Sequence, residues 1–410
     1  MADVVARVAN LYFFLRFSAP AIVNHAQMLV TLSAALGRPS SEAFGGWRLE
    51  AMKFLVIRFR QMGDAVLATA LLNSIRRSFP DAEIHFVLNS QLADLFAGHP
   101  SVDRVISFTP EVRHSPLRYL WKILKLMVSE RYDAVIDMRS TPNCLPFSLF
   151  APFARLRVGL RKGYTRFVMN RRIPVGDASV DVVTHNLRFL ESLAVFGPIT
   201  PTRDFSLSVT SDEITAYRRY LQSEGIDLGR PILLCGVVSK LAHKSWPMEN
   251  MRKVMEAVVR EFPQWQIVFN YAPGYEEEAA RRLYADLGSP ASVYINVRAS
   301  SMRELVALAS LSTAYFGNEG GARHIAQAVG TPSLVIVSPD VRKSNWIISN
   351  SVEALAIDAA DALTANNPSY PDTTIESRLS SMSYEARYAL ITPDLVLSRL
   401  RPFLLSRSSL

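Results

Sequence analysis

Three loops of this sequence carry residues that could do chemistry, and each follows an apolar run. The first is Gln61-Met62-Gly63-Asp64, between the run "KFLVIRF" and the amphipathic stretch 65–79. Gly63 permits a tight turn or a close approach to a ligand. Asp64 stands at the mouth of a predicted strand-to-helix turn, where a carboxylate has two interpretations. It caps the helix, or it serves as a general base in reach of an acceptor hydroxyl.

The second loop is "SKLAHKSWP", residues 239–247, again between a predicted strand and a predicted helix. The ammonium group of Lys244 could bind a diphosphate, and Ser239 could donate a hydrogen bond to it. A lysine in a loop can equally be a solvated surface residue, so the loop by itself leaves both interpretations open.

The third loop opens "GNEGGARHIAQAVGTP", residues 317–332. Free backbone amides at a helix N-terminus, together with the helix dipole, form an anion site. Gly320, Gly321 and Ala322 are the expected donors. The pattern is neither GxGxxG nor a P-loop. His324 lies one turn into the helix, where it either faces the same anion or is structural.

These loops require strands that end at one edge of a sheet, and the hydrophobic pattern predicts such strands. Apolar runs alternate with helical periodicity in two halves, which indicates parallel, doubly wound sheets whose ligands bind at the carboxyl ends of the strands. The expected strands are 53–59, 82–89, 102–108, 133–138, 231–238, 265–271, 293–297, 313–317 and 332–339. The expected helices are 65–79, 91–100, 117–132, 182–197, 212–225, 247–262, 276–288, 301–312, 322–330 and 392–406.

The length and composition fit a globular chain of two domains. The chain has 410 residues, of which 49% are hydrophobic and 20% charged, so a disordered chain is excluded. We predict a helical extension over 1–51, one Rossmann-like domain over 52–210, a second Rossmann-like domain over 211–384 and a C-terminal helix over 385–410. The net charge of +8 predicts an anionic partner. Cys144 and Cys235 have no metal-binding spacing and are expected to be buried thiols.

The extension 1–51 is apolar, but Arg16, Asn24, His25 and Gln27 interrupt it. No run is long enough to span a bilayer, and a signal-peptide pattern is lacking. Three interpretations remain: a helix packed on the body, an interfacial membrane helix, or natural translation from Met52.

Taken together, the loops resemble one family. The segment 53–108, with "GDAVLATALLNSIRRSFPDAEIHFV" and "HPSVDRVI", is similar to the N-terminal half of the bacterial ADP-heptose:lipopolysaccharide heptosyltransferases. "HKSWP" and "FGNEGGARHIAQAVGTP" resemble that family's later motifs in the same order. The resemblance implies a GT-B fold, two Rossmann-like domains facing across a cleft. It also implies that 52–210 is the acceptor domain and that 211–384 is the nucleotide-sugar domain. It also implies inverting transfer of heptose from ADP-heptose to the inner core, without an essential metal or other cofactor.

By position, the resemblance implies that Asp64 is the catalytic base, that Lys244 binds the donor phosphate with Ser239 nearby, and that the amides of 320–322 hold the diphosphate. Glu319 and His324 would lie at the donor site, and Glu276 would bind the ribose. An anionic, lipid-linked saccharide is the expected acceptor. We assign it to basic residues of the first half, Arg58, Arg60, Arg157 and Arg161. The implied location is the cytoplasmic face of the inner membrane.

The sequence departs from the family where Asp-Ser/Thr-Gly is usual, because it has Glu319-Gly320-Gly321. Arg323 stands where the family usually has an apolar residue, so we expect it to add charge beside the donor. Three rivals follow from the residues: a non-catalytic sugar-nucleotide-binding relative, an NAD-type dehydrogenase, and a nucleic-acid binder. The absent GxGxxG argues against the dehydrogenase, the retained Asp64 and Lys244 against the non-catalytic relative, and the lack of a basic-aromatic motif against nucleic acid.

Overall fold

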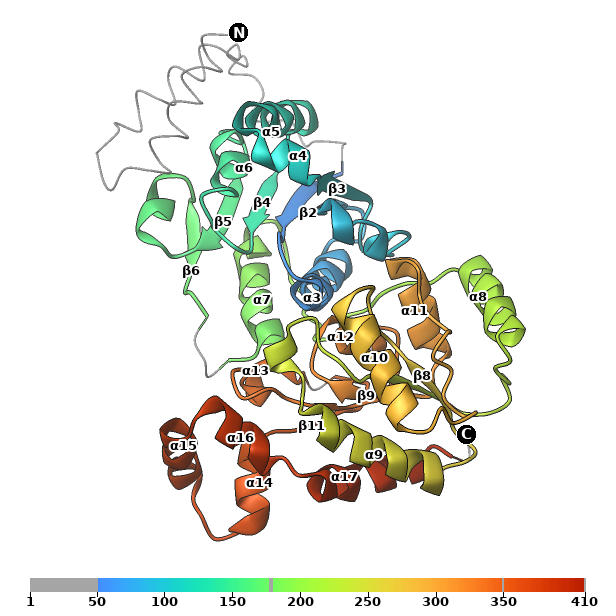
Figure 1. Cartoon of the computed structure of the whole chain (residues 1–410). Helices are drawn as coiled ribbons and strands as arrows, with labels where there is room; N and C mark the ends of the chain where they lie inside the picture. Colours follow the sequence, from blue (N-terminus) through green and yellow to red (C-terminus); the bar gives the residue numbers. More distant parts are fainter. Residues whose placement is uncertain (1–50, 177–179, 349, 409–410) are drawn as a thin grey trace, which may run out of the picture. The chain divides into compact units, whose positions relative to one another are not determined.

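The computed structural model describes residues 51–176, 180–348 and 350–408 (Figure 1). The chain divides into two compact units. The described part of the first comprises 51–60, 68–176 and 184–203, and that of the second comprises 61–67, 180–183 and 204–408. The short stretch 61–67, which contains Asp64, therefore belongs with the second unit.

The first unit is built on a six-stranded parallel sheet in the order β3-β2-β1-β4-β5-β6. Strands buried on both faces read as continuous apolar runs, which is why 53–57 and 134–137 were recognisable in the sequence. The strands are β1 (Lys53–Ile57), β2 (Glu83–Asn89), β3 (Arg104–Phe108), β4 (Ala134–Asp137), β5 (Leu156–Leu160) and β6 (Arg171–Ile173).

Helices cover both faces of this sheet (Figure 1). Leu55 and Ile57 point to a core that α5 and α6 close. Phe54, on the opposite face, packs on Phe79 and Phe196 with ring centroids 5.4 Å away in each case. The helices are α3 (Met62–Ser78), α4 (Pro110–His114), α5 (Pro116–Glu130), α6 (Leu145–Leu149) and α7 (Val182–Glu191), with 3-10 turns η2 (Ser90–Leu92), η3 (Asp94–Phe96), η4 (Gly163–Phe167) and η5 (Ser192–Val195).

The second unit holds a five-stranded parallel sheet in the order β11-β10-β9-β7-β8. Residues of α9, α10 and α17 share one buried core with this sheet, and α11 and α12 contact each other. The strands are β7 (Ile232–Gly236), β8 (Gln266–Phe269), β9 (Ala314–Asn318), β10 (Ser333–Ile336) and β11 (Ala354–Ile357). The helices are α8 (Ser211–Ser223), η6 (Ala242–Lys244), α9 (Met248–Glu261), α10 (Tyr275–Asp286), α11 (Met302–Leu311), α12 (Gly321–Ala328), α13 (Lys343–Trp346), α14 (Ala359–Asn366), α15 (Asp372–Ser381), α16 (Tyr384–Leu390) and α17 (Pro393–Leu405).

The prediction of parallel, doubly wound sheets is confirmed, but two of the predicted elements do not form as expected. The segment 293–297 is not a strand, because only Val293 forms a bridge, to Ile267 of β8. The predicted helix 91–100 is replaced by the two short turns η2 and η3. Both cysteines are free and buried, as expected. Burial raises the pKa of the Cys144 and Cys235 thiols well above the ordinary value.

The expected helical extension 1–51 lies, apart from residue 51, outside the described residues. Within the described ranges, no helix combines the length and the apolar character needed to cross a membrane.

Candidate active site

The site begins where β7 and β9 of the second unit end. Gly236 and Gly317 are paired there in the sheet. Gly317 has a φ of +146°, and a β-carbon on it would lie 2.3 Å from the carbonyl oxygen of Gly236. Only glycine allows this approach. The two strand ends are therefore held in close contact, and the loops that leave them start side by side.

Asn318 ties these loops together, and the sequence analysis did not identify it. Its side chain is buried, and its amide nitrogen donates to the carbonyls of Gly236 (3.1 Å) and Val237 (2.9 Å). Its carbonyl oxygen accepts a 2.7 Å hydrogen bond from the backbone amide of Trp246. All of these bonds are to backbone, so Asn318 fixes the path of the loop that carries Lys244.

Lys244 ends the short turn η6 and is half-buried. Its carbonyl accepts a 2.7 Å hydrogen bond from the hydroxyl of Tyr388. In the same loop the amide of Ser239 donates to the hydroxyl of Ser245 at 2.8 Å. The backbone around Lys244 is thus held at both ends of the loop.

The N-terminus of α12 follows directly after β9. Gly320 precedes the helix in an extended conformation, and Gly321 is the first helical residue. Gly320, Gly321 and Ala322 are all half-buried. The first amides of a helix have no intrahelical acceptor, so these three offer donors to an anion.

Glu319 lies between this helix and the Lys244 loop and is half-buried. Burial raises the pKa of its carboxyl group, while the positive charges of Lys244 and Arg323 act in the opposite direction. Lys244 and Glu319 are therefore close enough to interact electrostatically. Glu276 lies in the first turn of α10, where its carboxylate accepts a 3.1 Å hydrogen bond from the amide of Ala272.

Arg323 points into the protein and not to a ligand surface. Its side chain is fully buried, donating to the Gln327 side chain (2.5 Å) and to the Trp346 carbonyl (2.6 Å). Burial lowers the pKa of this guanidinium to about 10, so it stays charged at neutral pH. The expectation that Arg323 adds charge beside the donor is corrected in part, since the group serves an internal network.

His324 is also buried, with its ring 5.8 Å from that of Trp346. Burial, and secondarily the charge of Arg323, hold its pKa well below the ordinary value. The imidazole is therefore neutral. Its Nδ1 has no hydrogen-bond partner among the described residues.

Asp64 is the third residue of α3, and it is half-buried. The helix begins three residues before the predicted start, so Asp64 lies inside the first turn and cannot be the residue that precedes and caps it. Within the second unit, this turn packs on the start of α12. A β-carbon on Gly63 would lie 2.7 Å from Cδ2 of His324, and one on Gly321 would lie 2.6 Å from the sulfur of Met62. The turn bearing Asp64 thus lies beside the candidate diphosphate site.

The four arginines assigned to the acceptor differ in exposure. Arg58 is buried and donates to the carbonyl of Met138 at 3.2 Å. Arg157 is half-buried and donates to the carbonyl of Ala151 at 3.0 Å. Arg60 and Arg161 are exposed. In the structure, therefore, Arg60 and Arg161 are the two that present their side chains to solvent.

Asp137, at the carboxyl end of β4, is a buried acid that the sequence analysis missed. One carboxylate oxygen accepts hydrogen bonds from the amides of Arg139 (3.0 Å) and Ser140 (2.7 Å), and the other has no partner among the described residues. Burial raises its pKa to about 6. The hydrogen bonds fix the turn after β4, where Ser140 has a φ of +47°.

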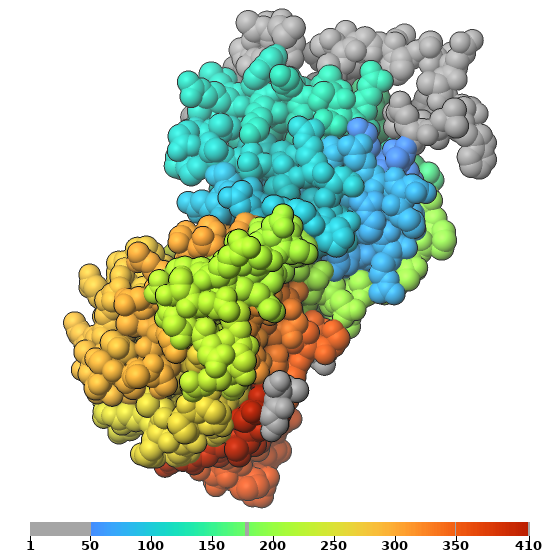
Figure 2. All heavy atoms as spheres, turned by 90° about the vertical axis from the view of Figure 1, so that its right-hand side faces the viewer, coloured from blue at the N-terminus to red at the C-terminus, as the bar shows by residue number. Residues whose placement is uncertain are grey.

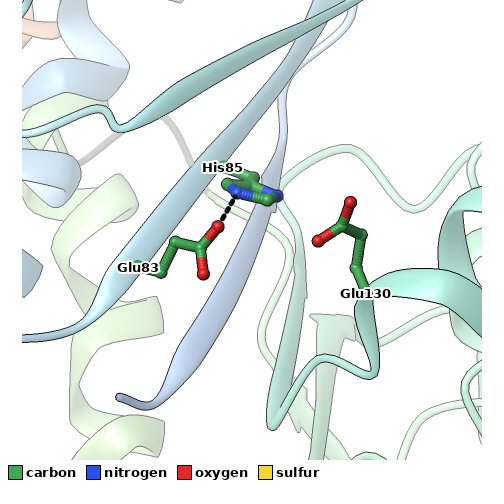
Figure 3. A group of neighbouring side chains, drawn as sticks. All are labelled: Glu83, His85 and Glu130. Atoms are coloured by element: carbon green, nitrogen blue, oxygen red, sulfur yellow. Dashed lines mark hydrogen bonds and ion pairs between the residues drawn. The ribbon is translucent and has the colours of Figure 1, made fainter. Parts of the chain in front are cut away.

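A separate group of Glu83, His85 and Glu130 could offer metal ligands within 4.8 Å of one another (Figure 3). Its carboxylates already have cationic partners in the protein. The ammonium of Lys53 lies 2.8 Å from Glu83 and 3.3 Å from Glu130, and Arg104 lies 2.7 Å from Glu130. We describe this group as an ion-pair cluster at the amino end of the first sheet.

Two parallel-sheet α/β units, with a candidate anion site at the strand ends of the second, form the GT-B fold. Solved structures share this fold. The glycosyl transferase family 9 protein from Veillonella parvula superposes with a TM-score of 0.71 at 15% identity, covering 88% of this chain and 99% of that one. ADP-heptose LPS heptosyltransferase II from E. coli superposes with a TM-score of 0.61 at 18% identity, covering 87% and 99%.

The chain belongs to glycosyltransferase family 9, the heptosyltransferases, whose family model matches residues 120–358, more than half of its length. It is 22% identical over 291 residues to lipopolysaccharide heptosyltransferase 1 of Campylobacter coli, which covers 70% of this chain and 83% of the relative. It is 25% identical to the core heptosyltransferase OpsX of Haemophilus influenzae, over 69% of this chain and 78% of the relative. The predicted family, fold and enzyme class are confirmed.

Proposed function

We propose that this protein transfers a heptose from ADP-heptose to the inner core of lipopolysaccharide, with inversion at the anomeric carbon. The observation that carries the proposal is the Asn318 junction, which holds the Lys244 loop beside the strand that leads into α12. Neighbouring loops thus carry a cation and a helix N-terminus, a combination that suits the diphosphate of a nucleotide sugar.

In the proposed reaction Asp64 accepts the proton of an acceptor hydroxyl. That oxygen forms a bond to the anomeric carbon as the bond between this carbon and the diphosphate oxygen breaks. ADP leaves with the electron pair of the broken bond. Lys244 and the amides of 320–322 stabilise the negative charge that develops on it. Ser239 and His324 border the same donor site in this proposal, and Glu276 binds the ribose.

Glu319 replaces the family's usual aspartate, and Gly320 the hydroxyl residue after it. Glutamate is one methylene longer, and glycine removes side-chain volume beside it, so the two changes offset each other in the pocket. We assign Glu319 and Gly320 to the sugar-binding part of the site. The acceptor is an anionic, lipid-linked saccharide at the cytoplasmic face of the inner membrane. The exposed Arg60 and Arg161 contact its phosphate or carboxylate groups. Arg58 and Arg157 support the first-unit backbone through their hydrogen bonds to carbonyl groups.

The test uses Asp64→Asn in the full chain. Turnover with ADP-heptose and a heptose-free core acceptor should fall by ~10²–10⁴-fold, because an amide cannot accept the proton. ADP affinity, measured by calorimetry, should stay at the parent value. Asp81→Asn, a change at an exposed aspartate, is the matched control.

Near-parent turnover of the Asp64 variant would refute the assignment of the base. A parent protein that binds ADP yet transfers no sugar to any core acceptor would instead identify a non-catalytic sugar-nucleotide-binding relative. Lys244→Ala tests the donor site separately. It should weaken ADP binding whether Asp64 is the base or the protein is a non-catalytic relative, so unchanged ADP affinity would show that the donor site is wrongly placed.

A further inference from the structure

Helix α5 of the first unit exposes a stripe of large apolar side chains to solvent. Leu117, Trp121 and Val128 are 55%, 46% and 44% exposed. Their spacing of four and seven residues places them on one side of the helix. The opposite side, with Tyr119, Ile123 and others, is buried in the core of the first unit. In the space-filling view α4 and α5, in teal, lie at the surface (Figure 2).

The same face carries cations and no exposed acid. Arg118, Lys122 and Lys125 are exposed and lie four and three residues apart. Lys122 donates to the carbonyl of Ser107 at 2.7 Å, whereas Arg118 and Lys125 have no ion pair among the described residues. The acid of α5, Glu130, lies at its last position and is paired with Lys53 and Arg104.

We call Leu117, Arg118, Trp121, Lys122, Lys125 and Val128 the α5 face. Apolar side chains and a tryptophan interleaved with basic residues match the interface of an anionic bilayer. There the apolar groups reach the acyl boundary and the cations meet lipid phosphates. A tryptophan ring is also favoured at headgroup depth.

A second possible occupant is the chain's own apolar segment 1–51. Lys53 pairs with Glu130 at the end of α5, so residue 51 enters the first unit next to this helix. Charge argues against this occupant. The segment contains four arginines and three acidic residues, and a segment with excess positive charge does not complement three cations, as anionic headgroups do.

We propose that the α5 face is the surface by which this protein docks on anionic phospholipid. The proposal rests on the proposed function only in that the acceptor is lipid-linked. Docking is measured without donor or acceptor, so a failure of docking and a failure of sugar transfer are separate results.

The experiment is co-sedimentation of the full chain with vesicles of phosphatidylcholine, with or without phosphatidylglycerol. The parent should bind the anionic vesicles and release them as salt is raised. Leu117→Gln with Trp121→Gln should weaken binding about tenfold or more. Arg118→Gln with Lys125→Gln should weaken it roughly fivefold per cation. The control, Leu405→Gln with Arg399→Gln, changes an exposed leucine and an exposed arginine on α17 and should bind as the parent does.

Transfer of sugar to a delipidated, soluble core acceptor should be unchanged in both α5 variants. Three results would overturn the proposal: no parent binding to anionic vesicles, equal binding to neutral vesicles, or α5 variants that bind like the parent. If the α5 variants bind vesicles like the parent, and also have a lower melting temperature or make residues 1–51 accessible to protease, the segment 1–51 is the occupant of the α5 face.

Discussion

The guanidinium of Arg323 donates a 2.6 Å hydrogen bond to the backbone carbonyl of Trp346, whose indole lies against the ring of His324. A buried cation therefore fastens the end of α13 onto the helix whose N-terminus forms the candidate anion site. The same guanidinium bonds Gln327, which in turn donates to the carbonyl of Ile348 at 2.9 Å. This network holds the segment that follows β10.

Arg323→Met should release this segment. Two acceptors, the buried Gln327 side chain and the partly buried Trp346 carbonyl, would lose their donor, at a cost of about 1–3 kcal/mol in the free energy of unfolding. Hydrogen exchange of the amides in 343–348 should accelerate. Arg342→Met, an exposed change beside the same segment, is the control. Unchanged exchange and stability in Arg323→Met would show that the network does not hold the segment.

Gly63→Ala should strongly reduce turnover while changing the free energy of unfolding comparatively little. The added methyl group would lie 2.7 Å from Cδ2 of His324, so the first turn of α3 must shift, and Asp64 with it. Displacement of a catalytic group by about 1 Å can cost ~10²-fold in rate. Gly163→Ala is the control, because nothing lies within 4 Å of the β-carbon it would add.

The double variant Gly63→Ala with His324→Ala tests the cause. Removal of the imidazole relieves the contact, so the Gly63 change should have a smaller effect in this background than in the parent. Equal effects in the two backgrounds would exclude a clash with His324.

Asn318→Ala should weaken ADP binding although Asn318 need not touch the nucleotide. The loop bearing Lys244 loses its bond to the Trp246 amide, and the carbonyls of Gly236 and Val237 lose their donor. We expect about a tenfold higher Kd by calorimetry, equivalent to ~1.4 kcal/mol. Asn250→Ala, on α9 of the same unit, should leave the Kd unchanged. A parent-like Kd in Asn318→Ala would show that the hydrogen bonds of Asn318 do not contribute to ADP binding.

Asp137→Asn should flatten the pH dependence of stability. The native pKa is raised to about 6 from 3.8, so between pH 4 and 6 the native state keeps a proton that the unfolded state has lost. The free energy of unfolding therefore falls as pH rises through this window, by up to ~3 kcal/mol from this group. Urea titrations across the window should show that fall in the parent and lack it in the variant. The control, Asp81→Asn, should show the same fall as the parent. An equal dependence of the free energy of unfolding on pH in the parent and in Asp137→Asn would contradict the interpretation of Asp137 as a buried acid with a raised pKa.

The hydrophobic pattern predicted the strands that lie in the middle of each sheet, because burial on both faces leaves a continuous apolar run. It missed β6 and β11, which are short edge strands with exposed residues. It also predicted a strand at 293–297, a segment with strand composition that forms only one bridge at the edge of β8. Whether such a segment pairs depends on its neighbours in space, and these are not encoded in its own periodicity.

The candidate site shows a similar division. Gly63, Lys244 and Gly320 were recognisable because glycine and lysine at strand-to-helix turns carry local meaning. Asn318 and Asp137 were not, because their roles depend on partners brought near by folding. Asn318 bonds residues about eighty positions earlier in the chain. A signal was available for it, since a polar residue ending an apolar strand after glycine is unusual.

The two cysteines give the protein a practical property. Cys144 and Cys235 are its full complement, both are fully buried, and burial keeps their thiols protonated. The folded protein should therefore react very slowly with maleimide reagents. Lys125→Cys with Leu405→Cys would then take one fluorophore in each unit without prior removal of native thiols. Energy transfer between the two dyes would then measure, in solution, whether the distance between the two labelled positions changes when nucleotide sugar is added.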